Sequence, residues 1–323
     1  MTIQQLKYIT ALDEHRNFVK AAEECMVTQP GLTIQLKNLE EEIGVKIFDR
    51  TKVPLKPTKA GKEIISRAKK ILREVEGIRE FVIYEKNQLE GECTIGVIST
   101  LSPYLVPQFI KKMKEVAPKM HFTIKELPTG LLINNALTGD IDIALMATPT
   151  GANGLKEYPV FYEPFVAYLY EGHKMRGAEY YELQPQDKPQ LLLLEHEYCY
   201  NAQLLDICGL THGAEKHDGF TYDISSIETL KNLVKADLGF AILPLLSVIN
   251  EKENPMYKEF KDPKPVREIS LVVAETFSRK LLLQKISETI YACLPESMKQ
   301  DFKYKKIQWN DSPYFIESVK GFL

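Results

Sequence analysis

The spacing of apolar residues near the N-terminus predicts two helices separated by a tight turn. Small and apolar residues recur through "NFVKAAEEC", the pattern breaks at Met26 and Val27, and it resumes in "QPGLTIQLKNLEEEI". Thr28 is placed to cap the second helix, and Pro30 falls in its first turn, where the missing N–H of proline costs nothing. The apolar positions of this second helix are Leu32, Ile34, Leu36, Leu39 and Ile43.

The polar residues of the second predicted helix are left to face outward. They are Gln29, Thr33, Gln35 and Lys37. An outward polar face is what a recognition helix in the major groove of DNA requires. An ordinary helical hairpin with a solvated polar face has the same pattern, so periodicity by itself leaves both interpretations open.

From residue 60 to about residue 90, apolar residues recur alternately four and three positions apart. This spacing is typical of a coiled-coil stripe along one long helix. The stripe consists of Ile64, Ala68, Ile71, Val75, Ile78 and Val82. It has to be buried, either against the domain that carries the helix or against the same helix of a second subunit.

After residue 90, apolar runs alternate with amphipathic stretches, which predicts an α/β fold of the doubly wound kind. The runs expected to form strands are 93–99, 121–127, 141–147, 166–170, 190–195, 240–246 and 268–274. The stretches expected to form helices are 103–117, 130–139, 225–239 and 279–293. The C-terminal tail, residues 301–323, is left unassigned.

Length and composition narrow the class of protein. The chain has 323 residues and is 44% hydrophobic, which is enough for two or three domains with cores of their own. Its apolar runs are far too short for a membrane span, and polar residues interrupt the N-terminus, which argues against a signal peptide. We therefore expect a cytoplasmic protein without a membrane partner. The net charge of −3 combines a basic segment, residues 1–87, with an acidic remainder, which weakly favours a nucleic-acid partner.

The chain has five cysteines, and in a reducing compartment a close pair is more often metal-binding, redox-active or simply buried than part of a permanent disulfide. Cys199 and Cys208 form such a pair, on either side of a plausible helix. Cys25, Cys93 and Cys293 fall at positions expected to be core. No Cys/His spacing resembles a zinc site and no nucleotide-binding motif is visible, so we expect neither a metal nor a cofactor.

The N-terminal motifs resemble those of the LysR-type transcriptional regulators. The stretch "AAEECMVTQPGLTIQLKNLEEEIGVKIFDR", followed by "PTKAG", carries Ala-Ala, Thr-Gln-Pro, Leu-Glu, Gly-Val-x-x-Phe-x-Arg and Thr-x-Ala-Gly in the order and spacing of that family. The resemblance implies an all-α winged helix-turn-helix DNA-binding head at 1–59, a linker and dimerisation helix at 60–90 and a regulatory domain at 91–300. The regulatory domain would consist of two Rossmann-like lobes resembling those of periplasmic binding proteins. Lobe I would cover about 91–163 and 267–300, and lobe II about 164–266.

The same resemblance implies that a homodimer or homotetramer binds double-stranded DNA. The start of the second helix would read base edges, and a wing formed by "RTKVPLKPT" would contact phosphates. The residues implicated on the helix are Thr28, Gln29, Pro30, Thr33, Gln35 and Lys37, and those on the wing are Arg50, Lys52 and Lys56.

The close cysteine pair resembles that of the peroxide-sensing members of the family, in which two such cysteines form a reversible disulfide. Cys199 would be the sensing cysteine and Cys208 the resolving one, with a glutaredoxin- or thioredoxin-like thiol as the reductant. Peroxide oxidises a thiolate to a sulfenic acid, which condenses with a second thiol. A helix that begins close to Cys199 would favour the thiolate through its positive end.

The resemblance also assigns a peroxide pocket. Thr100, Thr129 and Arg267 match the residues that the peroxide-sensing members use there. The residue before the sensing cysteine is Tyr198 where these members commonly have histidine, and His196 lies two positions earlier. In an extended segment residues 196 and 198 share one side, so His196 could partly replace that histidine, although a surface histidine fits the sequence as well.

Two other functions are compatible with the sequence. A regulator of this family could bind a small organic effector between its lobes, in which case the cysteines would be buried and incidental. A thiol peroxidase would share the cysteine chemistry, but it would leave the DNA-binding head and the long helix without a role. A redox sensor differs from both because it reacts about once per subunit and needs no added metabolite.

Overall fold

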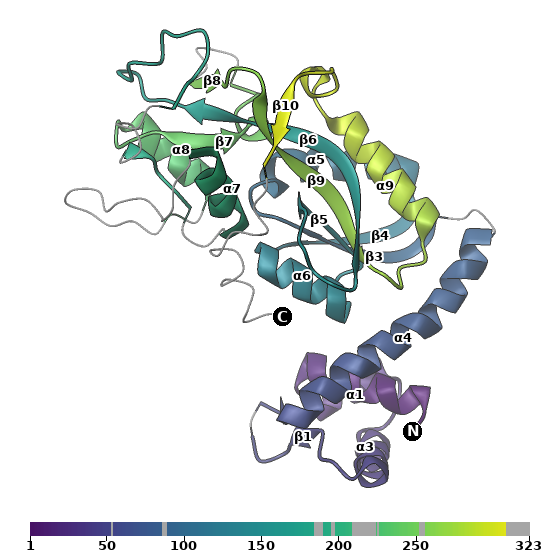
Figure 1. The fold of residues 1–323 in the computed structure, drawn as a ribbon. Coiled ribbons are helices and arrows are strands. Elements are labelled where there is room, and N and C mark those ends of the chain that lie inside the picture. The colour runs from purple at the N-terminus through teal and green to yellow at the C-terminus, as the bar shows by residue number, and fades with distance from the viewer. Residues whose placement is uncertain are drawn as a thin grey trace. The chain divides into compact units, whose positions relative to one another are not determined.

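The computed structural model divides the chain into two compact units, Met1–Asn87 and Gln88–Leu323. It describes residues 1–52, 54–85, 89–183, 190–194, 198–208, 224, 226–251 and 256–307. Figure 1 shows both units and labels most of their helices and strands.

The first unit is a small helical head. Its elements are α1 (Ile3–His15), α2 (Phe18–Glu24), α3 (Gln29–Ile43), β1 (Phe48–Asp49), β2 (Lys56–Pro57) and α4 (Lys59–Glu85). Thr28 caps α3 as predicted, because its hydroxyl accepts the N–H of Gly31 at 3.2 Å. The apolar pattern did not predict α1, whose first turn is held by a reciprocal cap between Thr2 and Gln5. β1 and β2 pair as the antiparallel hairpin expected for the wing.

One predicted core position of α3 is wrong. Leu32, Leu36 and Leu39 are spaced by about one turn and are buried in the head, whereas Ile34 is 57% exposed. Ile34 lies two residues from Leu32 and from Leu36, so the period of about 3.6 residues per turn directs it away from the leucine face. The outward face of α3 therefore carries one apolar side chain among its polar residues.

The second unit is built on a mixed β-sheet. Its strands are β3 (Glu90–Val97), β4 (Lys119–Glu126), β5 (Ile143–Thr148), β6 (Leu155–Tyr168), β7 (Ala241–Pro244), β8 (Tyr257–Glu259), β9 (Lys264–Ala274) and β10 (Tyr304–Lys306). Its helices are α5 (Ser102–Val116), α6 (Thr129–Thr138), α7 (Tyr198–Cys208), α8 (Ile227–Lys235) and α9 (Lys280–Cys293), with 3-10 turns η2 (Leu245–Ser247) and η3 (Glu296–Met298). The strands follow the order β4-β3-β5-β9-β6-β7, with β10 beside β9 and β8 beside β6. The predicted α/β class with an all-α head is thus confirmed.

Only part of the sheet has the parallel pairing of a doubly wound fold. β3 pairs in parallel with β4 and β5, and α5 and α6 connect these strands. β9 instead runs antiparallel to both β5 and β6. It does so because it returns from the far part of the unit and does not follow a crossover helix. α5 packs against α9, and α6 packs against β5 and β9.

β6 and β9 lie side by side and connect the two lobes of the regulatory unit (Figure 1). β6 pairs with β9 from Leu155 to Pro164 and with β7 from Phe165 onward. The sequence pattern predicted only the C-terminal end of β6. The earlier part of the strand contains Pro159 and has charged residues between its apolar ones, so it does not look like a strand. Proline is tolerated there because this half of β6 pairs with β9 alone in the described sheet.

The apolar run 190–195 is not the strand that its sequence predicts. Leu191 makes a single bridge to Phe240, and Leu192 and Leu194 are buried in the core without extending a ladder. A run of apolar residues predicts that a segment is buried, but it does not predict whether that segment is a strand or a packed loop. Similarly, the strand predicted at 240–246 ends at Pro244, where the chain enters η2.

Candidate functional site

A buried ion pair joins β6 and β9 where they pass between the lobes. Arg267 Nε and Nη2 donate to Glu163 Oε2 at 2.9 and 2.7 Å, and neither side chain is exposed. Glu163 Oε1 accepts the N–H of Leu246 at 3.0 Å, which ties η2 to the pair. The family resemblance pointed to Arg267 and not to Glu163, although a carboxylate in the apolar stretch 160–169 was a visible signal. Buried charges of this kind persist only when they are paired.

Arg267 also orients Thr100, which lies between β3 and α5. Its Nη1 donates to Thr100 Oγ1 at 2.8 Å, and its Nη2 donates to the Thr100 carbonyl at 3.3 Å. Because Oγ1 accepts from the guanidinium, the hydroxyl hydrogen of Thr100 points elsewhere and is available to another acceptor. Thr100 is buried, so that acceptor has to be small or part of the protein itself.

Further buried polar atoms have no hydrogen-bond partner among the described residues. They include Oγ1 of Thr129 in the first turn of α6, and Oδ1 of Asn201 and both atoms of the Gln203 amide in α7. Gln203 follows Cys199 by four residues, so the two positions lie on one face of α7. Buried polar atoms normally have a hydrogen-bond partner. Because these atoms have none among the described residues, they are available to bind a small polar molecule. Gln203 was not predicted, although it is a polar residue between Ala202 and Leu204.

Tyr200 connects α7 to the ion pair. Its side chain is wholly buried, its hydroxyl donates to the carbonyl of Ile242, and its ring packs against Phe165 with centroids 6.4 Å apart. The Arg267 guanidinium lies 6.0 Å from the centre of the same Phe165 ring. Burial raises the pKa of Tyr200, the charge of Arg267 opposes that rise, and Cys208 adds to it. Tyr200 of α7 and Arg267 of β9 thus both contact the ring of Phe165.

Cys199 and Cys208 lie at opposite ends of α7. Cys199 is the second residue of the helix and Cys208 the last, so a rise of about 1.5 Å per residue separates their Cα atoms by about 13 Å. A disulfide requires a separation of about 4.4–6.8 Å. Cys208 is buried in the apolar core and carries a thiol. The side chains of Tyr198 and Cys199 and the whole of His196 lie outside the described residues.

A small cavity of about 70 Å³ lies beside Thr100. Its walls come from the loop after β3, the end of β4, Leu194 and the start of α8. Tyr104 and Glu228 both line it, and the Tyr104 hydroxyl donates to the Glu228 carboxylate at 2.8 Å. This volume suits a molecule of the size of water or peroxide, whereas sites for organic ligands measure about 300–1,000 Å³.

On the head, the residues implicated in DNA recognition lie on the surface. Those at exposed positions are Thr28, Gln29, Pro30, Gln35, Lys37, Arg50, Lys52 and Lys56, and Thr33 is half-buried. The hydroxyl of Thr33 donates back to the carbonyl of Gln29 at 2.9 Å. The amide oxygen of Gln35 accepts from Gln5 at 3.2 Å, so Gln35 is partly committed to α1.

Models of two related domains match the chain. Residues 3–62 match the bacterial regulatory helix-turn-helix proteins of the lysR family, and residues 86–290 match the LysR substrate binding domain. The chain belongs to the LysR family of transcription regulators.

Among its relatives, the chain is 33% identical to the hydrogen peroxide-inducible genes activator of Pectobacterium carotovorum subsp. carotovorum, over 90% of this chain and 96% of that protein. It is 32% identical to the DNA-binding transcriptional dual regulator OxyR of Escherichia coli (strain K12), over 90% and 95% of the two chains. A full-length cysteine-to-aspartate variant of OxyR from Pseudomonas aeruginosa matches the structure with a TM-score of 0.78 and 32% identity, over 91% of this chain and 99% of the other. A peroxide-bound cysteine-to-serine variant of OxyR from Corynebacterium glutamicum matches with a TM-score of 0.60 and 28% identity, over 92% and 94%.

In this LysR-family regulator, Glu40 anchors the wing to α3. Its buried carboxylate accepts the N–H groups of Ile47 and Phe48 at 2.8 and 3.3 Å through Oε1. Its Oε2 accepts from Lys46 at 3.3 Å and from Arg50 at 3.1 Å. Arg50 therefore holds the wing in place as well as being available to a phosphate. The structural role of Glu40 was not predicted, because three consecutive glutamates, as in residues 39–42 ("LEEE"), are typical of a solvent-exposed helix face.

The stripe of α4 in this LysR-family regulator divides between two environments. Ala68 is buried in the core of the head and Ile64 is half-buried, whereas Ile71 is 39% and Ile78 is 70% exposed. Val75 is half-buried, and the side chain of Val82 lies outside the described residues. The C-terminal half of the stripe thus presents apolar side chains that the head does not cover.

Within the residues that the structure describes, we find no group of three or more His, Cys, Asp or Glu side chains arranged to hold a metal ion. In the same part of the chain, none of the helices combines the length and the apolar character that crossing a bilayer requires.

Proposed function

We propose that this LysR-family regulator binds double-stranded DNA through its head and senses hydrogen peroxide through Cys199, which forms a reversible disulfide with Cys208. The observation that carries the proposal is the position of both cysteines at the ends of α7. Tyr200 of that helix packs on the ring of Phe165, which Arg267 also contacts, and Arg267 donates to Thr100. Relatives that are activators of hydrogen peroxide-inducible genes, and a similar structure with peroxide bound, support the choice of stimulus.

The chemistry requires two steps at sulfur. The Cys199 thiolate attacks one oxygen of hydrogen peroxide, the O–O bond breaks, and the departing hydroxide takes up a proton to leave as water. Cys199 is then a sulfenic acid. The Cys208 thiolate attacks the Cys199 sulfur and displaces the sulfenic hydroxyl as a second water, so two thiols and one peroxide become one disulfide and two waters. A dithiol reductant of the glutaredoxin or thioredoxin kind restores the pair.

The surrounding residues suit the first step. Cys199 lies in the first turn of α7, where the positive end of the helix favours the thiolate over the thiol. The hydroxyl hydrogen of Thr100, the hydroxyl of Thr129 and the amide of Gln203 are the buried polar groups that we assign to peroxide. Arg267 and Glu163 hold Thr100 in the required orientation. Tyr198 and His196 stay candidates for the same pocket.

The second step requires α7 to unwind, which supplies the switch. Cα atoms about 13 Å apart in a helix cannot be bridged by a disulfide that tolerates about 4.4–6.8 Å. Oxidation therefore has to remodel the segment 199–208 together with the core that Tyr200 and Cys208 now fill. A segment with two alternative packings, biased by one covalent bond, is a recognised basis for relaying a signal to distant domains.

Mass spectrometry of the intact chain after mild peroxide tests this proposal. We expect one peptide pair, containing Cys199 and Cys208, to become linked at about one peroxide per subunit and to separate again with thioredoxin or glutaredoxin. Absence of that link, with all five cysteines recovered as thiols, would overturn the sensing function.

The alternative of a small organic effector is less well supported. The cavity beside Thr100 measures about 70 Å³, which is too small for most metabolites, and the larger cavity of about 320 Å³ between β6 and the end of α9 has none of Thr100, Thr129 and Gln203 in its walls. The polar atoms of Thr129 and Gln203 are buried, so their partner has to be small, and a peroxide molecule is small and can both donate and accept hydrogen bonds.

For DNA recognition, we expect Gln29 and Lys52 to act differently. Gln29→Ala should cost about 1–3 kcal/mol of discrimination at one base pair, because Gln29 is exposed in the first turn of α3. Lys52→Ala should weaken binding to all sequences alike and lower the salt slope by about one, because Lys52 is an exposed wing cation. Fluorescence anisotropy with an operator selected in vitro, its single-base variants and several salt concentrations measures both effects. An equal loss on every sequence from both changes would contradict the assignment.

For assembly, we propose that residues 60–90 form a dimerisation helix. Replacing both Ile71 and Ile78 by Asp should dissociate the dimer, because two unpaired charges would enter an apolar seam at a cost of several kcal/mol. Light scattering of the full chain measures the mass. The control is Lys62→Gln with Lys70→Gln, which changes the net charge equally but lies off the stripe. An unchanged mass for the Asp variant would place the seam elsewhere.

A further inference from the structure

The segment that follows α9 joins the sheet beside Arg267. β10 pairs in parallel with β9 from Tyr304↔Lys264 to Lys306↔Val266. The N–H of Ile307 then continues the ladder to the carbonyl of Val266 at 3.1 Å. The paired stretch of β9 thus ends directly before Arg267. The three residues "YKK" carry no recognisable strand pattern, which is why the sequence left them unassigned.

Lys306 pairs with a buried carboxylate of β9. Its Nζ lies 2.7 Å from Oε2 of Glu268, whose side chain is only 8% exposed. The other oxygen of Glu268 accepts from the Thr148 hydroxyl of β5 at 2.8 Å. Tyr162 of β6 also donates to the Glu268 carboxylate. Residues from β5, β6 and β10 therefore meet at this one carboxylate.

The charge of Lys306 keeps Glu268 ionised. Burial acts to raise the pKa of Glu268, but hydrogen bonds from Lys306 and Thr148 and the charge of Lys306 outweigh burial and hold the pKa below its usual value. Burial raises the pKa of Tyr162 to about 12, and the Glu268 carboxylate adds to that rise, so the phenol stays neutral. The positive charge that faces Glu268 thus comes from the C-terminal segment.

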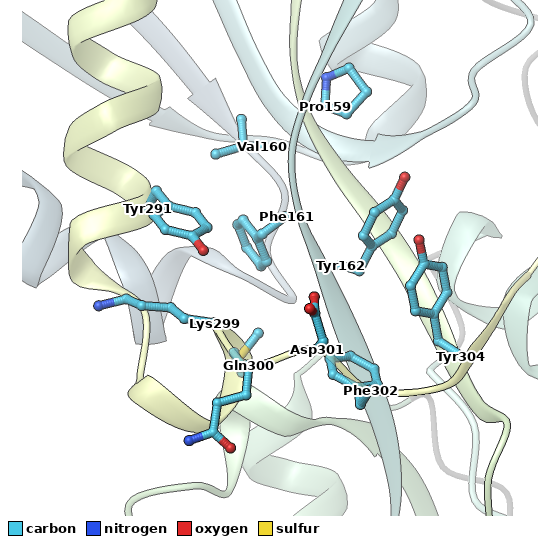
Figure 2. Close-up of a pocket in the computed structure, with 11 residues that line it drawn as sticks. Pro159, Val160, Phe161, Tyr162, Tyr291, Lys299, Gln300, Asp301, Phe302 and Tyr304 are labelled. Carbon is cyan, nitrogen blue, oxygen red and sulfur yellow. The ribbon is translucent and has the colours of Figure 1, made fainter.

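The same segment holds β6 through aromatic contacts. Figure 2 shows Tyr304 beside Tyr162, and the two rings stack with centroids 4.7 Å apart. Phe302 packs edge-on against Tyr304 at 5.8 Å, and both residues line a cavity of about 320 Å³ between β6 and the end of α9. In a strand, neighbouring side chains alternate between faces. Tyr162 and Glu268 are therefore held on the face opposite to that of their neighbours Glu163 and Arg267.

We propose that Lys306 is a positioning residue for the peroxide pocket, because its ion pair with Glu268 docks β10 onto β9 and so holds Arg267 beside Thr100. This inference rests on the proposed sensing function. It explains why the short strand β10 contacts both β6 and β9 at the residues next to the buried ion pair.

The rate at which Cys199 reacts with hydrogen peroxide in the full chain tests the proposal. Lys306→Met should slow this reaction by about 10- to 100-fold, the loss that a small misplacement of a positioned group causes. Lys306→Arg should restore it, because arginine can pair with Glu268. Lys305→Met is the matched control, since Lys305 is exposed on the same strand and should react at the wild-type rate. Alkylation of Cys199 by iodoacetamide, which needs no peroxide pocket, should be the same in all of these proteins.

The pH dependence of thermal unfolding gives an independent readout. In the wild type the pKa of Glu268 is depressed, so its contribution to stability is complete above the glutamate value of an unfolded chain, about 4.3, and is lost as the pH falls through the lower folded value. Without Lys306 the hydrogen bond and the charge that lower this pKa are lost, so the contribution of Glu268 at neutral pH shrinks. The Tm of Lys306→Met should therefore fall further below that of Lys305→Met as the pH rises from acid to neutral.

The outcomes separate this inference from the proposed function. A wild-type peroxide rate in Lys306→Met, with the Cys199–Cys208 link still formed, would overturn the positioning role and leave the sensing function intact. A wild type that forms no such link would overturn the sensing function itself. Where Lys306→Met is too unstable to assay, the double variant Glu268→Gln with Lys306→Met leaves no unpaired buried charge. Slow reaction in that folded protein supports the proposal, and a wild-type rate overturns it.

Discussion

Cys199→Ser is expected to abolish the response of this LysR-family regulator to hydrogen peroxide. A serine hydroxyl does not form a sulfenic acid, so neither the first oxidation nor the disulfide that follows it can occur. The loss should be complete, with no linked peptide in mass spectrometry and no peroxide-dependent change in DNA binding. Both are measured on the full chain during a peroxide titration.

Two cysteine variants complete this test. Cys208→Ser should leave the sulfenic acid of Cys199 unresolved, so that dimedone traps it and the response is weakened or altered. Cys293→Ser is the control, because burial raises the pKa of Cys293 and so keeps its reactive thiolate scarce. A Cys199→Ser protein that still changed its DNA binding with peroxide would show that the sensor lies elsewhere.

Arg267→Met is expected to have the largest effect on stability. It leaves the Glu163 carboxylate buried without its guanidinium partner, and breaking a buried pair in this way costs about 3–5 kcal/mol. Thr100 loses the donor that orients its hydroxyl in the same change, so the reaction of Cys199 with peroxide should slow as well. Calorimetry of the full chain and stopped-flow oxidation measure the two effects.

The double variant Glu163→Gln with Arg267→Met separates stability from sensing. Removing both charges relieves the unpaired carboxylate, so most of the lost stability should return. The peroxide reaction should stay slow, because Thr100 still lacks its donor. Recovery of a wild-type rate in the double variant would show that Arg267 does not organise the pocket, and an unchanged Tm in Arg267→Met would show that the pair is unimportant for the fold.

The helix-turn-helix could be predicted from the sequence because the signals that form it are local. The Thr28 cap, Pro30 in the first turn and the leucines of α3 all act within one or two helical turns. Ile34 marks the limit of that prediction, since an apolar residue alone does not say on which face it falls. The helix between Cys199 and Cys208 was likewise visible in the sequence.

The residues around the candidate sensing site depend on the tertiary structure. Glu163 lies 104 residues from Arg267, and Thr100 lies 167 residues from it. Contacts between residues so far apart leave no periodic pattern in the sequence. Which residue of β6 lies opposite Arg267 is decided only by the register of β6 against β9. The leucine run at 190–195 was wrongly predicted as a strand, and the segment that forms β10 was left unassigned, for the same reason: neighbours distant in sequence decide whether an extended segment pairs.

The sequence by itself therefore determined the helical head, the alternation of strands and helices and the spacing of the two cysteines, all of which follow from side-chain patterns within a few turns or strands. Only the tertiary structure decided that Glu163 pairs with Arg267, that Arg267 orients Thr100 and that Lys306 meets Glu268. Burial makes each of these charged contacts obligatory, and burial is a property of the packed chain.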